Sequence, residues 1–232
     1  VVHPGAGNPA GTLQNALLHY DPTLGILPRA GIVHRIDKET SGLLVIARTL
    51  ESHTALTEMI EAHAVQRHYE AICVGVMTAG GTVDKPIGRH STDRIKMMIR
   101  SDGREAVTHY RVVTRFRAHT HVRVQLETGR THQIRVHLSH IGYPLVGDSV
   151  YGKRLVIPKG ASAAFDETLR SFHRQALHAS RLEFMHPITH KSVSYEAPLP
   201  ADFKQLLKAL ATDLRVSEKA AAKARAADPR GA

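Results

Sequence analysis

The stretch that most constrains this chain is residues 31–48, GIVHRIDKETSGLLVIAR. Its second half, residues 42–47, is an uninterrupted apolar run, which predicts a buried strand. Buried charges are costly without partners, yet the first half gathers five ionisable side chains: His34, Arg35, Asp37, Lys38 and Glu39. We therefore expect Asp37 to lie at the lip of this strand, held by the core behind it as a reactive group on a rigid scaffold.

A simpler interpretation of the same segment stays open at this point. It could be a polar turn in which Asp37 and Thr40 only satisfy local backbone groups. Spacing within the segment does not decide between the two, so the decision depends on the rest of the chain.

The charge of the chain indicates the class of partner. Its 31 Lys and Arg residues against 21 Asp and Glu residues give a formal net charge of +10. Neutralising phosphates with basic side chains releases counterions, so we expect a nucleic acid as the partner.

Other features of the composition predict the compartment. No apolar run approaches the ~18 residues of a membrane span, and residues 1–9 do not resemble a signal peptide. The one cysteine, Cys73, excludes an intrachain disulfide and lies in an apolar run, where we expect it to be a small buried hydrophobe. We predict a cytoplasmic protein, a monomer, with no membrane partner.

Hydrophobic periodicity predicts more strands than helices. Helical spacing covers residues 12–19, 51–65, 131–140 and 202–214, and strand-like patterns cover residues 67–76, 105–116, 120–128, 174–183 and 192–196. Many strands with few helices between them indicate an α+β fold built on a long mixed or antiparallel sheet. From residue 217 the chain is rich in Ala and Lys without an apolar face, so we expect residues 213–232 to be a frayed or disordered tail.

A basic segment, residues 89–104, is predicted to form a projecting β-hairpin. Its Arg94, Lys96 and Arg100 could follow a phosphate backbone. A solvated charged hairpin without a ligand explains the same pattern equally well.

The sequence predicts neither a metal nor a nucleotide cofactor. Seventeen histidines invite a metal site, but HExxH and CxxC do not occur, and His119 and His121 would share a strand face without an obvious third ligand. The glycine-containing segments match neither the Walker pattern nor the dinucleotide fingerprint.

A carboxylate acting with an arginine is the remaining chemistry. Asp37 and Arg130 both lie among short polar residues next to predicted elements, and an arginine fork can hold a carboxylate ionised in a dry pocket. Tyr69 could add an aromatic platform, and such a set suits chemistry at a flat, uncharged ring attached to a sugar. Arg130 could instead be a surface arginine and Tyr69 a core aromatic.

Four long motifs carry a resemblance to a known family. HRIDKETSGLLVIAR resembles the signature of the RluA family of pseudouridine synthases, with Ile36 where that signature has Leu. RHYEAICVG, ETGRTHQIRVHLSHIGYPLVGDSVYG and RQALHASRLEFMHP resemble the tyrosine, arginine and late strand motifs of the same family, in the same order. VVHPGAGNPAGTLQNALLHY resembles the start of the catalytic domain in a branch acting on the large ribosomal subunit. The resemblance covers roughly residues 1–212.

The resemblance implies the pseudouridine synthase fold, with the active site in a basic cleft, and an isomerase that needs no cofactor. Asp37 would be the essential aspartate, either as nucleophile on the ribose C1′ or as base toward a glycal intermediate. Arg130 would pair with Asp37, Tyr69 would stack on the uracil, Arg35 would enter the RNA where the flipped nucleotide leaves a gap, and Ile134 would line the base pocket.

The implied substrate is uridine in large-subunit (23S) ribosomal RNA. The same chemistry on other ribosomal or transfer RNA uridines, or a non-catalytic RNA-binding or ribosome assembly factor, remains an alternative. The resemblance also implies a catalytic domain over residues 1–212 and an S4-type RNA-binding domain ahead of it, which lies outside this chain.

Overall fold

The computed structural model describes residues 1–5, 8–93, 95–152 and 155–226 of the chain. Its main sheet has the strand order β1-β8-β2-β7-β6-β3, with β9 pairing with β8. The strands are β1 (Ser41–Gly42), β2 (Gln66–Val74), β3 (Gly81–Asp84), β6 (Val107–Arg115), β7 (His119–Leu126), β8 (Leu177–Met185) and β9 (Ser192–Glu196). Within this sheet, as far as the chain is described, only the β1–β8 pair is parallel. The mixed sheet of an α+β fold is therefore confirmed.

The two faces of the central strand β2 support two separate cores. Tyr69, Ala71 and Cys73 pack on one face with residues of α3 (Gln133–His140). Ile72 packs on the other face with residues of α4 (Ala163–Ser171) and α5 (Ala201–Ala226). This alternation follows from the period of two in a strand, and it buries Cys73 completely, as predicted.

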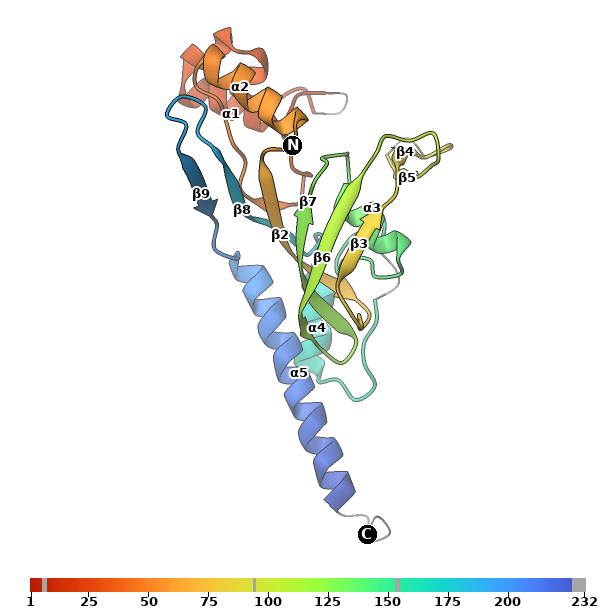
Figure 1. Ribbon diagram of the computed structural model, residues 1–232. Coiled ribbons are helices and arrows are strands. Elements are labelled where there is room, and N and C mark those ends of the chain that lie inside the picture. The colour runs from red at the N-terminus through yellow and green to blue at the C-terminus, as the bar shows by residue number, and fades with distance from the viewer. Residues whose placement is uncertain (6–7, 94, 153–154, 227–232) are drawn as a thin grey trace.

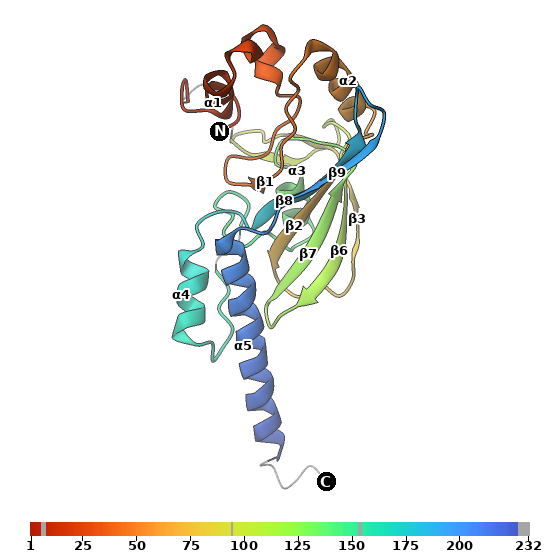
Figure 2. The same cartoon turned by 90° about the vertical axis from the view of Figure 1, so that its left-hand side faces the viewer.

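Apart from α3, which packs on a face of the sheet, the helices lie toward two ends of the molecule. Figures 1 and 2 show α1 (Leu13–Tyr20) and α2 (Leu50–Glu61) at the end opposite to that from which α5 extends, and α4 lies beside α5. Two short 3-10 helices, Pro22–Ile26 and Pro28–Gly31, connect α1 to the segment that carries Asp37. No helix in the described part of the chain is long and apolar enough to cross a membrane.

The predicted buried strand over residues 42–47 is wrong in its extent. Only Ser41 and Gly42 form a strand, since the φ of +107° at Gly42 departs from extended geometry. Glycine is needed there because a Cβ would lie 2.1 Å from the carbonyl oxygen of Ala179. Beyond it, Leu43 and Val45 pack with residues of α2 and β8. The apolar run reflects packing between elements, and pairing in the sheet ends after two residues.

The C-terminal helix is longer than the sequence predicts. Helix α5 continues from Ala201 to Ala226, whereas helical spacing predicts an end at residue 214 and a frayed tail beyond it. Its first half is anchored by the buried Phe203, Leu206 and Leu210, and Ala and Lys, which favour helix, extend it from there. Residues 227–232 lie outside the described residues. Helix α4 is a further element that the sequence pattern does not predict.

The predicted hairpin is present as a small sheet of its own, but its strands lie within residues 87–99 and not over residues 89–104. Strands β4 (Ile87–Arg89) and β5 (Met97–Ile99) pair antiparallel and form no part of the main sheet in the described structure. Figure 1 shows this hairpin at the same end of the molecule as α1 and α2. Ile99 and Met97 pack toward Val136 of α3.

Candidate active site

A pocket of about 850 Å³ contains five residues that the sequence singles out. Asp37, Tyr69, Arg130, Arg35 and Ile134 all line it, although they come from three distant parts of the chain. Lys96 and Arg100 lie on the β4–β5 hairpin and do not line the pocket, and Arg94 lies outside the described residues.

The backbone around Asp37 is fixed by the start of β8 and the residues just before it. The Asp37 carbonyl accepts a hydrogen bond from Thr40 N (3.0 Å), and the buried Thr40 hydroxyl accepts one from Gln175 Nε2 (3.1 Å). Ser41 then begins β1, where its hydroxyl lies 2.9 Å from His178 Nδ1 on β8. Asp37 is therefore in a turn, as the simpler interpretation holds, and the turn is tied to a strand behind it.

Arg135 is the arginine that pairs with Asp37. Its Nη1 lies 3.2 Å from Asp37 Oδ2, and both side chains are largely buried. The same guanidinium donates to Asp148 through Nε (2.7 Å) and Nη2 (2.9 Å). Such a fork–fork pair fixes the plane of the guanidinium, so the nitrogen that reaches Asp37 is held in place.

The predicted pairing of Arg130 with Asp37 is wrong. Arg130 Nε donates to the backbone carbonyl of Glu105 (2.8 Å). The physical reason is position: Arg130 precedes α3, where its backbone N–H donates to the Gln133 side chain, whereas Arg135 lies within the helix on a fully buried stretch. Arg130 still lines the pocket wall and can contact a ligand there.

Asp148 remains ionised although its side chain has no exposed surface. Burial alone would raise its pKa, but the hydrogen bonds from Arg135 and from the backbone N–H groups of Tyr151 and Val150 hold the pKa below its usual value. In return, Asp148 and Asp37 raise the pKa of Arg135 against the effect of its own burial. Asp148, Arg135 and Asp37 are thus joined in one chain of ion pairs behind the pocket.

Tyr151 connects this triad to the basic hairpin. Its ring lies 5.0 Å from the guanidinium carbon of Arg135, and its hydroxyl accepts a hydrogen bond from Met97 N on β5 (2.7 Å). The hydroxyl also lies 2.8 Å from His132 Nδ1. Burial lowers the pKa of His132, so its neutral ring can accept a hydrogen bond from the Tyr151 hydroxyl.

Tyr69 and Ile134 form the apolar side of the pocket. They are 6% and 4% exposed and belong to one hydrophobic cluster. Burial raises the pKa of Tyr69 to about 12, and the nearby Asp37 adds to this rise against the opposing effect of Arg67. The phenol therefore stays protonated at neutral pH.

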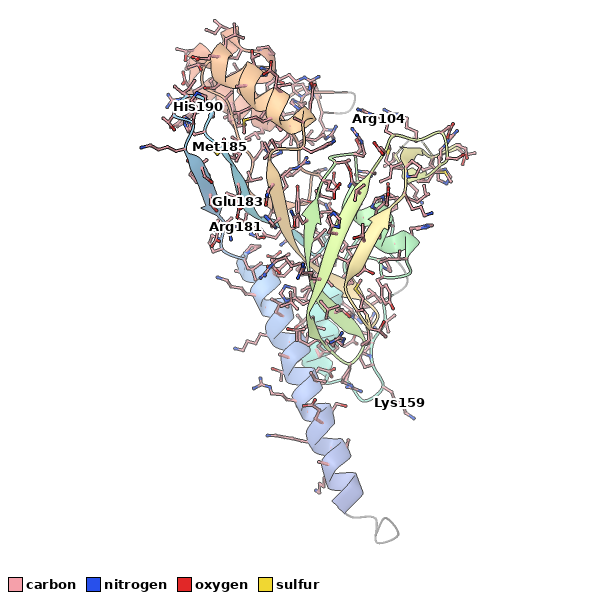
Figure 3. All side chains as sticks on the ribbon, in the orientation of Figure 1. Arg104, Lys159, Arg181, Glu183, Met185 and His190 are labelled. Atoms are coloured by element: carbon pink, nitrogen blue, oxygen red, sulfur yellow. The ribbon has the colours of Figure 1, made fainter. Side chains whose placement is uncertain are left out.

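The pocket has a strong excess of positive charge. Among the described residues, the acidic side chains that line it are Asp37 and Glu61, whereas six arginines do so: Arg29, Arg35, Arg67, Arg104, Arg130 and Arg135. Figure 3 shows Arg104 at the end of the main sheet nearest the β4–β5 hairpin. The predicted basic cleft is present, and it suits a polyanion that brings a neutral group to Asp37.

Sequence reasoning missed Arg135, Asp148 and Tyr151. One signal could have found Arg135, because it lies between Ile134 and Val136 in the helical run QIRVHL, and an arginine buried there needs an acidic partner. No comparable signal marks Asp148 or Tyr151 in the loop GYPLVGDSVYG.

Comparison with known proteins decides the family. The family described as RNA pseudouridylate synthase matches residues 10–140, more than half of the chain. The chain belongs to this family. It is 60% identical over 213 residues to ribosomal large subunit pseudouridine synthase D of Pseudomonas aeruginosa, covering 92% of the chain and 67% of that protein. The protein of the same name from Escherichia coli K12 is 56% identical, with 92% of the chain and 65% of that protein covered.

Solved pseudouridine synthase folds agree with the architecture. Human RNA pseudouridylate synthase domain containing 1 superposes with a TM-score of 0.63 at 28% identity, covering 82% of this chain and 74% of that chain. The chain spans about two thirds of the length of the curated bacterial relatives.

Proposed function

We propose that this pseudouridine synthase converts uridine to pseudouridine in the RNA of the large ribosomal subunit. The observation that carries the proposal is the Asp37 carboxylate, held by Arg135 inside an arginine-lined pocket. The names of relatives 56–60% identical over 92% of the chain support large-subunit RNA as the substrate. Because all of these pocket residues come from one chain, we propose that a monomer suffices, working in the cytoplasm.

The reaction requires no net change in composition. The bond from uracil N1 to ribose C1′ breaks, the ring turns in the pocket, C5 joins C1′, and C5 loses its proton while N1 gains one. Asp37 acts at the sugar, either as nucleophile on C1′ or as base toward a glycal intermediate. Both routes need a carboxylate in a fixed orientation, and the Arg135 guanidinium holds Asp37 in that orientation before the reaction begins.

Base flipping precedes the chemistry. A stacked base is out of reach of Asp37, and extruding it costs a few kcal/mol. Stacking on an aromatic ring returns ~1–3 kcal/mol per base, and Tyr69, which packs in one cluster with Ile134, offers that ring. Its raised pKa favours a stacking role over that of a resting phenolate base. Arg35, exposed beside Asp37 at the pocket, is placed to enter the gap in the RNA.

Tritium release from large-subunit RNA labelled at uridine C5 tests the function. The wild-type chain should release tritium, and Asp37→Asn should abolish release while RNA binding persists. Asp166→Asn on α4 is the matched control, since that carboxylate pairs only with Arg170 in the described structure and should leave release unchanged.

Three outcomes separate the alternatives. Release from transfer RNA or other ribosomal RNA alone would favour the same chemistry on a different substrate. RNA binding without release from any RNA would favour a binding or assembly factor. Release by Asp37→Asn equal to wild type would overturn the role of Asp37.

A further inference from the structure

Arg67 is a buried cation for which the described part of the chain provides no counterion. The residue is 5% exposed, and no described carboxylate comes within 4 Å of its guanidinium. Its Nη2 donates to the backbone carbonyl of Glu127 (2.8 Å), while its Nε is buried without an acceptor. An arginine stays charged in proteins, and a buried charge without a partner is costly. The site therefore favours an anion that the protein itself does not supply.

The surroundings of Arg67 reinforce this charge. Arg67 lines the same pocket as Asp37, and Arg130 and Arg104 line it too. The neighbouring His34 adds neither a carboxylate nor a charge, because it accepts a hydrogen bond from Val45 N at Nε2 (2.9 Å) and burial lowers its pKa to about 4. Arg67, Arg104 and Arg130 thus give this part of the pocket wall a positive charge.

The backbone leaves room for the Arg67 guanidinium at one specific place. A Cβ added to Gly129 would lie 2.5 Å from Arg67 Nη1. The glycine therefore lets the guanidinium pass close to the loop that leads to Arg130. A side chain at position 129 would displace the Arg67 guanidinium, so the position of this cation depends on the glycine.

Arg67 and Tyr69 lie on the same face of β2, and both line the pocket. Arg67 and Tyr69 are two residues apart on β2, so they face the same side of the sheet, about 6.6 Å apart along the strand. A nucleotide whose base stacks on Tyr69 carries its phosphate to one side of that ring. Arg67 lies on the same side of the sheet and has donors to spare.

We propose that Arg67 binds a phosphodiester next to the flipped uridine and so anchors the target nucleotide over Asp37. This inference rests on the proposed function, since it concerns the same pocket. The Arg67 contact would form only when RNA is bound. It would increase affinity and help to position the sugar over Asp37.

A charge-neutral linkage tests this contact directly. The probes are uridine-containing stem–loop RNAs in which the phosphodiester on the 5′ or on the 3′ side of the loop uridine is replaced by a methylphosphonate. Binding affinity is measured for each probe with the wild-type chain, Arg67→Met, Arg67→Lys and Gly129→Ala.

Neutralising one of these two linkages should weaken wild-type binding about tenfold or more, since a charge-assisted hydrogen bond no longer forms. Arg67→Met should bind the unmodified RNA about as weakly as the wild-type chain binds the neutral probe. Its own affinity should fall by less than about twofold when that linkage is neutralised. Gly129→Ala should behave like Arg67→Met, because it displaces the guanidinium without removing the charge. Arg67→Lys keeps a positive charge, so it should retain part of the affinity loss that the neutral linkage causes in the wild-type chain.

Arg123→Met is the matched control. Arg123 lies on β7, exposed and paired with Glu70 on the other face of the sheet, so its replacement should leave the penalty of the neutral linkage as large as in wild type. Equal penalties for wild type, Arg67→Met and Gly129→Ala on both neutral probes would overturn the inference. Because binding is the readout, this result stays separate from tritium release: a wild-type chain that releases tritium but shows no coupling contradicts only the Arg67 contact.

Discussion

Asp148 holds Arg135 by two hydrogen bonds of 2.7 and 2.9 Å, and the third nitrogen of the same guanidinium reaches Asp37 at 3.2 Å. One carboxylate is wholly buried, whereas the other faces the pocket. The arrangement divides two tasks between two aspartates: Asp148 orients the arginine, and the arginine orients Asp37.

Asp148→Ala should lower the free energy of unfolding by about 3–5 kcal/mol, because it leaves Arg135 buried with only its weaker contact to Asp37. The double variant Asp148→Leu with Arg135→Met should recover part of that stability, since an apolar pair replaces both charges while the backbone N–H groups of Val150 and Tyr151 still lose their acceptor. The double variant should nevertheless release no tritium, because no arginine then orients Asp37. Urea unfolding and tritium release measure the two effects, and a double variant with wild-type release would show that Arg135 is dispensable.

The sequence predicts the sheet well because its strands bury one or both faces. The predicted strand at residues 192–196 coincides with β9, and the predicted helices near α1, α2 and α3 are present. The local sequence pattern gave a wrong prediction where an apolar residue packs against elements that are distant in the sequence. Leu43 and Val45 are apolar because they pack on α2 and β8, and a local apolar run does not distinguish such packing from a strand.

The candidate site was predictable up to the choice of arginine. Asp37, Tyr69 and Ile134 converge on one pocket, in agreement with their place in the motifs. Two arginines five residues apart in one motif offer equal candidates in sequence, and only the turn of α3 decides that Arg135 faces Asp37. The second carboxylate, Asp148, comes from a loop whose path no periodicity describes.

The β4–β5 hairpin should contribute to RNA binding through charge. Lys96→Ala combined with Arg100→Ala should weaken binding, and the logarithmic salt slope should fall by about 0.7 for each phosphate that is no longer neutralised on single-stranded RNA. Arg100 is already held by Asp102 through bonds of 2.7 and 2.6 Å. Asp102→Asn should therefore free Arg100 and strengthen binding. Salt titrations of affinity decide this, and an unchanged slope in the double variant would exclude a role of the hairpin in binding phosphates.

The half-buried His34 and the buried His119 should make stability depend on pH. Burial lowers the pKa of His34 and of His119 to about 4 from 6.5, so the folded state resists protons that the unfolded chain takes up. Stability should then be full above pH 6.5 and fall as the pH drops toward 4, by up to about 3 kcal/mol for each histidine. His34→Gln keeps an acceptor for Val45 N, and His119→Leu suits an apolar site. Urea unfolding at each pH should show a shallower fall in both variants, and an unchanged fall would contradict the assignment.

Tyr151→Phe should uncouple the hairpin from the active site without removing the ring beside Arg135. The hydroxyl that this change removes is the acceptor for Met97 N and the neighbour of His132 Nδ1, so the amide of Met97 is left without its partner. Removing one partner of such a bond costs about 1–3 kcal/mol, which should appear locally as faster hydrogen exchange at the Met97 amide.

The Arg135–Asp148 bonds do not depend on that hydroxyl, so exchange in α3 should stay at its wild-type rate in Tyr151→Phe. Tyr143→Phe provides the matched control, because Tyr143 packs against the core beside Gly75, in a different cluster from Met97 and Ile99 of the hairpin. If hairpin exchange is unchanged in Tyr151→Phe, the hydroxyl does not tether β5. If exchange rises at the Met97 amide alone and tritium release falls with it, hairpin position and the setting of Asp37 are linked through this one side chain.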